Sequence, residues 1–89
     1  MTHNHGFLDA EVLPIDQRRA AELPEAALHG DAERFSDLLA ELVAAGPVRA
    51  LAVVGVLSRN LVATLIAAHG RDGALRILES TRLDAAVAE

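Results

Sequence analysis

The chain has 89 residues, enough for one small domain, and 52% of them are hydrophobic, which argues against a disordered chain. It contains no cysteine, so disulfide bonds, thiolate zinc sites and a cysteine nucleophile are excluded. Thirteen acidic residues against eight arginines, with no lysine, give a net charge of −5, which offers no positive surface to a phosphate backbone or to anionic lipid.

Residues 1–13, MTHNHGFLDAEVL, predict a flexible N-terminal arm in front of a single helical bundle domain at 14–89. The start lacks a basic stretch followed by an apolar one, so we expect no signal peptide and a cytoplasmic location. His3 and His5 lie two residues apart without a third ligand, and we therefore expect no metal site there.

The first helical region runs from Pro14 to His29. Asp16 is a candidate cap, and Gly30 follows the region as a C-terminal glycine. A proline inside a helix costs about 3 kcal/mol, so Pro24 predicts two pieces, one ending near Glu22 and one beginning at Pro24.

Asp31 to Ala45 is the clearest amphipathic helix, with Asp31 as its cap. Its apolar residues follow one helical stripe: Phe35, Leu38, Leu39, Leu42 and Val43. Gly46 and Pro47 then mark a break between helices.

Pro47 begins the most apolar stretch of the chain, which reads VRALAVVGVLSRNLVATLIAAH and ends before Gly70. It predicts one helix over 47–69, about 34 Å long. A compact domain of this size is only about 31 Å across, so the helix spans the whole body. Apolar residues occupy nearly every face, and such a helix must be buried, shared with a second copy or placed in a membrane.

A membrane span is disfavoured by the polar residues of this helix. The uncharged stretch between Arg49 and Arg59 has only nine residues, whereas a span needs about 20. The shorter helices cannot cover every face of so long a rod, and an uncovered apolar stripe marks an association surface. We therefore expect a homodimer and no membrane contact. The candidate interface residues are Leu51, Val54, Gly55, Ser58, Arg59, Asn60, Leu61 and Leu65.

Arg59 and Asn60 have two interpretations. They either face solvent or set the register of the dimer, as a polar residue does in a coiled-coil seam. In a buried setting Arg59 needs a carboxylate partner, for which the candidates are Glu41, Asp37 and Glu79.

The last region runs from Asp72 to the C-terminus. Thr81 to Asp84 has the spacing of a capping box, so one continuous helix and two short helices both remain open over 72–88. Arg71, Arg76 and Arg82 would be the nucleic-acid contacts of an alternative reading, a helix-turn-helix-like DNA-binding regulator using residues 60–82.

No pattern of catalytic residues occurs. The serines lack a G-x-S-x-G elbow, and the sequence has no phosphate-binding loop. The carboxylates of Glu33 and Asp37 lie on the polar face of a predicted helix, where solvation is their ordinary role. We expect no enzyme activity, no catalytic residues and no cofactor.

The tract LVATLIAAHGRDGALRILEST, Leu61 to Thr81, resembles a pattern in small Ala/Arg-rich helical proteins of actinobacteria and their phages. The resemblance covers about a quarter of the chain, implies a small accessory or phage-encoded protein and carries no catalytic residues over. The sequence thus predicts an all-α bundle of four to five helices around the long helix 47–69, which acts by protein–protein contact.

Overall fold

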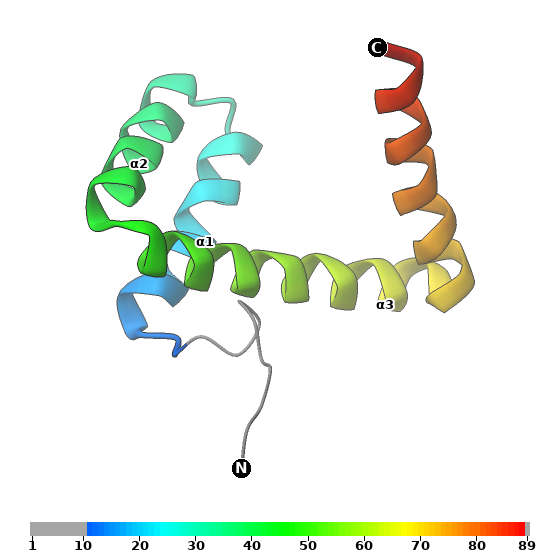
Figure 1. Ribbon diagram of the computed structural model, residues 1–89, viewed down its shortest axis with the longest axis horizontal. Helices are drawn as coiled ribbons and strands as arrows, with labels where there is room; N and C mark the ends of the chain where they lie inside the picture. The colour runs from blue at the N-terminus through cyan, green and yellow to red at the C-terminus, as the bar shows by residue number, and fades with distance from the viewer. Residues whose placement is uncertain (1–10, 89) are drawn as a thin grey trace. The chain divides into compact units, whose positions relative to one another are not determined.

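The computed structural model describes residues 11–88 and contains three helices: α1 at Pro14–Leu28, α2 at Ala32–Ala45 and α3 at Pro47–Ala88 (Figure 1). No strand occurs over this range, which confirms the all-α class and the single long helix. The predicted count of four to five helices is wrong. The predicted N-terminal arm lies mostly outside the described residues, as do His3 and His5.

Helix α1 is not broken at Pro24, contrary to the prediction of two pieces. Leu23 and Ala26, on either side of the proline, are both buried in the core, whereas Pro24 is exposed. Burial of one leucine stabilises by about 1.5–3 kcal/mol, which is comparable with the proline penalty of about 3 kcal/mol. Tertiary packing therefore holds the last turn of α1 helical despite the missing N–H donor.

The connection between α1 and α2 has the geometry expected from its glycine and aspartate. Gly30 takes a φ of 68°, and the N–H of Asp31 donates to the carbonyl of Ala26 at 3.0 Å. This bond and the one from Gly30 to Ala27 form a Schellman motif, which ends the helix. The Asp31 side chain then accepts from the N–H of Arg34 at 3.0 Å, so Asp31 caps α2 as predicted.

Helix α3 changes direction at Gly70, whose φ of 73° and ψ of 170° are not helical. The predicted end of the long helix at this glycine is confirmed. Beyond it one helix continues to Ala88, which settles the choice left open for 72–88. The Thr81 hydroxyl donates to the carbonyl of Ile77 at 3.2 Å, so it belongs to the preceding helical turn and begins no new helix.

The chain divides into two compact units, one ending at Ser58 and the other beginning at Arg59. We call their described parts the N-terminal unit (residues 11–58) and the C-terminal unit (residues 59–88). The single bundle domain over 14–89 stays a prediction.

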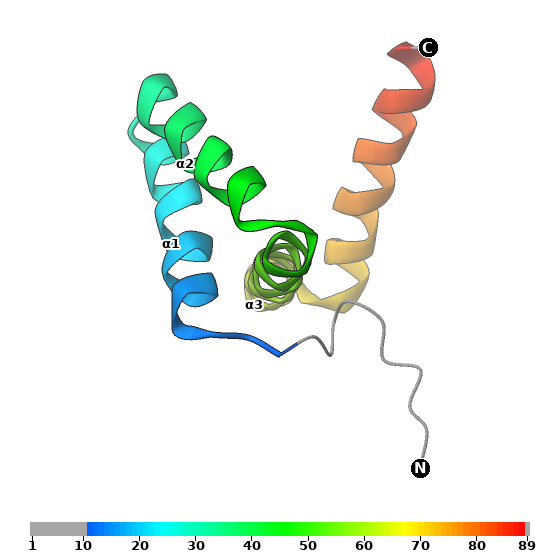
Figure 2. The same cartoon turned by 60° about the vertical axis from the view of Figure 1, so that its left-hand side comes forward.

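The N-terminal unit contains the hydrophobic core. Helices α1 and α2 lie side by side, and the beginning of α3 packs across them (Figure 2). All three contribute buried side chains: Ala20, Leu23, Ala26, Leu38, Leu42, Val53 and Val56. Of the predicted α2 stripe, Leu38 and Leu42 are buried, whereas Leu39 and Val43 are exposed.

Candidate protein-binding surface

The C-terminal unit is built around a corner at Gly70, visible in Figure 1 where the α3 ribbon turns from yellow to orange. Its φ and ψ fall in a region that is essentially restricted to glycine. A Cβ atom on Gly73 would lie 2.8 Å from the Cβ of His69, too close for a real contact. Gly73 thus lets the chain after the corner pass close to the helix before it.

A groove of about 190 Å³ lies within the C-terminal unit. We call it the C-terminal groove, and its lining residues are Val62, Leu65, Ile66, Arg71, Ala74, Leu75 and Leu78. Arg71 is the one charged residue of this set. Small-molecule sites usually enclose about 300–1,000 Å³, so this groove is smaller than a usual cofactor site.

Leu75 and Leu78 also line a second hollow of about 240 Å³, together with Glu79 and Arg82. The two leucines therefore form a ridge shared by two hollows, which we call the Leu75–Leu78 ridge. One hollow is apolar and the other is bordered by a cation and a carboxylate that pair with each other.

The C-terminal unit has almost no buried side chains of its own. Among residues 59–88 only Gly73 and Ala74 are buried. Its exposed large apolar side chains, each between 38% and 86% accessible, are Leu61, Val62, Ile66, Leu75, Ile77, Leu78, Leu83 and Val87. Exposed apolar side chains in this number are typical of a surface that contacts another molecule.

The predicted dimer-interface residues fall in both units. In the N-terminal unit, Leu51 and Val54 are 47% and 45% exposed, while Gly55 is buried and Ser58 is half-buried. Of the interface candidates in the C-terminal unit, Leu65 is half-buried, whereas Arg59, Asn60 and Leu61 are exposed. The dimer interface formed by these residues stays a prediction.

The three arginines of the DNA-binding alternative are all exposed. By helical periodicity Arg76 lies about 140° around the axis from Arg71, so the two do not share a face. Arg82 forms an ion pair with Glu79. Three carboxylates alternate with these arginines along the same helix: Asp72, Glu79 and Asp84. The helix therefore presents no uninterrupted positive face.

A buried ion pair that sequence reasoning missed holds the N-terminal unit together. The Asp16 carboxylate is fully buried, accepts from the Leu13 N–H at 2.8 Å and pairs with the Arg49 guanidinium. Arg49 also donates to the Glu11 carbonyl at 3.3 Å. Asp16 does cap α1, but from the third helical position. An available signal was Arg49 itself, a cation near the start of a largely apolar helix that requires a carboxylate when it is buried.

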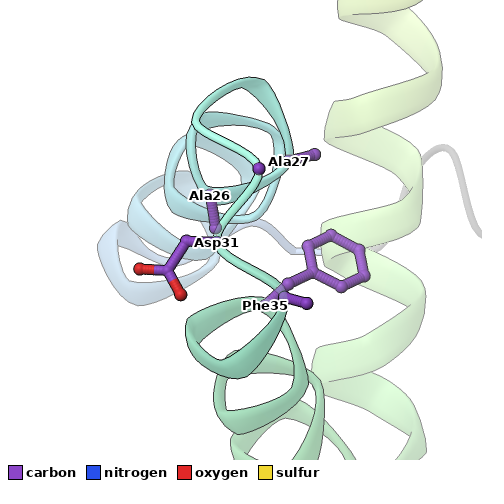
Figure 3. Close-up of a pocket in the computed structure, with 6 residues that line it drawn as sticks. Ala26, Ala27, Asp31 and Phe35 are labelled. Atoms are coloured by element: carbon purple, nitrogen blue, oxygen red, sulfur yellow. The ribbon is translucent and has the colours of Figure 1, made fainter.

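A further hollow, of about 220 Å³, lies where α1 ends and α2 begins. Figure 3 shows the Asp31 carboxylate and the Phe35 ring pointing to opposite sides. Asp31 is already engaged as the α2 cap, and the rest of the lining is alanine and glycine. This hollow therefore offers no side chain for catalysis or metal binding.

Charge is distributed unevenly between the two units. Residues 11–58 contain eight carboxylates and four arginines, whereas residues 59–88 contain three carboxylates and four arginines. The excess of negative charge in the described chain thus lies in its N-terminal unit.

Across the described residues, no group of three or more histidine, aspartate or glutamate side chains is placed to hold a metal ion.

Helix α3 is long and apolar enough to cross a membrane by length and composition alone. Its most apolar 18-residue stretch has a mean hydropathy of 1.9, and 22% of that stretch is buried within the chain. The core helix of a soluble protein meets the same criterion.

Comparison of the chain with protein families, with curated proteins and with solved structures gives no match.

Proposed function

We propose that this protein is a non-enzymatic binding module that acts through protein–protein contact, with its C-terminal unit as the contact surface. The observation that supports this is the exposure of eight large apolar side chains in a unit whose buried residues are a glycine and an alanine. Burial of each such side chain stabilises a contact by about 1.5–3 kcal/mol when complete.

The size of the C-terminal unit supports the same proposal. Its 30 described residues fall below the roughly 40 residues at which an isolated domain usually needs a disulfide, a metal or association. The chain has no cysteine, so a disulfide is excluded. Helices of this length are marginal in water without tertiary packing. Contact with another chain supplies the burial that the unit lacks.

The mode of action that we propose is occupancy: the module covers a surface of its partner in the cytoplasm and thereby changes the partner's activity. This suits a small accessory or phage-encoded modulator. The alternative, a DNA-binding regulator that uses Arg71, Arg76 and Arg82, is less well supported, because carboxylates alternate with these arginines.

A photo-crosslinking amino acid at position 75 tests the proposal in cells that express the full chain. Leu75 is 56% exposed and lines the C-terminal groove, so we expect discrete crosslinked protein species. The matched control carries the same amino acid at position 28. Leu28 is 84% exposed but belongs to the N-terminal unit.

Crosslinks at position 75 that disappear when Leu78→Glu is added, with none at position 28, support the proposal. Equal crosslinking at both positions, or none at either, contradicts it. Crosslinks from position 75 to nucleic acid alone favour the DNA-binding alternative.

A further inference from the structure

We infer that the partner seated on the C-terminal unit is a second copy of this chain, whose Leu75–Leu78 ridge enters the C-terminal groove while its own groove receives the ridge of the first copy. This inference rests on the proposed contact surface, and it names a second copy of the chain as the occupant of that surface in place of a different protein whose activity is changed. It also moves the centre of the predicted homodimer from Leu51–Leu65 to the corner at Gly70.

The shape of the surface is self-complementary. A twofold contact uses the same patch on both copies, so the patch must carry both a protrusion and a recess that accepts it. Leu75 and Leu78 supply the protrusion, and the hollows on which they border supply the recess. Two such surfaces interlock in the manner of knobs into holes.

The charge of the C-terminal unit favours a like partner. Its three carboxylates and four arginines nearly cancel, so two copies meet there without strong repulsion. The ridge is bordered by both signs, with Arg71 on the groove and Glu79 and Arg82 on the second hollow. A strongly acidic or basic partner would leave one sign unmatched.

The number of helical segments in the C-terminal unit also supports a dimer. Each C-terminal unit supplies two helical segments, one before and one after Gly70. Two copies therefore supply four, the smallest common closed helical bundle. A standard interface uses roughly 20–30 residues from each side, so a dimer formed by this unit alone uses most of residues 59–88.

The first experiment is the mass of the full chain in solution, by light scattering over a range of dilution. We expect twice the chain mass of 9.4 kDa for the wild type. The double variant Leu75→Glu/Leu78→Glu should have the monomer mass and keep the urea midpoint of the N-terminal unit, to which neither leucine belongs. Leu28→Glu, an exposed leucine of the N-terminal unit, is the matched control and should remain a dimer.

A second measurement tests whether the two copies meet at Leu75. Because the chain has no cysteine, Leu75→Cys introduces a single thiol. We expect mild oxidation to convert most of this variant to a disulfide-linked dimer, while Leu28→Cys stays largely monomeric on a denaturing gel. Equal crosslinking of the two variants, or a dimer that Leu75→Glu/Leu78→Glu leaves intact, overturns the inference.

Failure of this inference is separable from failure of the proposed function. A wild-type monomer at every concentration overturns the self-association. If position 75 still crosslinks to a different protein, the binding module stands with another partner. A monomer that gives no protein crosslink but binds phosphatidylglycerol vesicles overturns both.

Discussion

The two units of this chain divide apolar residues in opposite ways. In the N-terminal unit, seven buried side chains from three helices meet in one core, and the buried Asp16 forms an ion pair with Arg49. In the C-terminal unit, a comparable supply of leucine, isoleucine and valine stays exposed. Six large apolar side chains are exposed in the first unit as well, but that unit has a buried core of its own, whereas the second has none.

Composition alone does not reveal this difference, because both units are rich in aliphatic residues. The difference lies in geometry. Gly30 and Gly46 separate three helices that can pack on one another, whereas Gly70 divides only two helical segments. Two segments can cover one face of each other and no more. The predictions below therefore treat the units as distinct in stability.

The largest effect is expected at the buried ion pair. Asp16→Ala leaves the Arg49 guanidinium largely buried without its carboxylate, and removal of one partner from such a pair costs about 3–5 kcal/mol. We expect the urea midpoint of the N-terminal unit to fall accordingly. The double variant Asp16→Leu/Arg49→Met should be more stable than Asp16→Leu or Arg49→Met alone. If the losses of unfolding free energy of the two single variants simply added in the double variant, the pairing would be contradicted.

A matched pair of leucine substitutions measures the core. Leu23→Ala opens a cavity among the buried side chains and should lower the free energy of unfolding by about 2–5 kcal/mol. Leu28→Ala, five residues later on α1, removes an exposed side chain and should change it by no more than about 0.5 kcal/mol. Thermal unfolding checks both, and similar losses would mean that the core is misplaced.

The two glycines with the largest φ test whether the units are independent. Gly46 has a φ of 100°, so Gly46→Ala strains the entry into α3 and should destabilise the N-terminal unit by about 1–3 kcal/mol. An alanine Cβ at position 70 would meet no neighbouring atom, but the backbone conformation there is strained for any residue except glycine, so Gly70→Ala should convert the corner to continuous helix. We expect it to leave the N-terminal unit unchanged and to abolish the dimer, as followed by light scattering.

The smallest effect is expected for the two partly exposed ion pairs of Glu22, one of which lies within α1 while the other joins α1 to α2. Glu22 lies 3.7 Å from Arg34 and 3.9 Å from Arg18. Glu22→Gln should cost at most about 1 kcal/mol, because solvent screens such pairs. The loss should shrink further in 1 M salt, as measured by urea unfolding. A salt-independent loss would show that packing of the side chain matters more than its charge.

Local signals in the sequence predicted the ends of the helices well. Gly30, Asp31 and Gly70 each have a short-range backbone role, and each takes the predicted one. Pro24 misled the prediction because its penalty is local, whereas the burial of Leu23 that offsets it depends on α2 and α3.

The candidate surface was predicted only in part. The predicted association surface lies on the helix 47–69 and includes Leu65, whereas Leu75 and Leu78 of the C-terminal groove were not predicted, because the groove depends on how the chain folds back at Gly70 and past Gly73. Gly73 carries no pattern that marks a close approach, since the requirement comes from His69 across the corner. Asp16 and Arg49 are 33 residues apart, beyond the reach of any periodicity argument.

That separation has a consequence for the order in which the chain folds. The Arg19–Glu41 contact between α1 and α2 closes a loop of 22 residues, whereas the Asp16–Arg49 pair closes one of 33, so we expect the buried pair to form later. An interaction made after the transition state governs unfolding more than folding. We expect Arg49→Met to speed unfolding strongly in stopped-flow measurements and to leave the folding rate nearly unchanged. The buried pair then sets how long the native state persists before it unfolds.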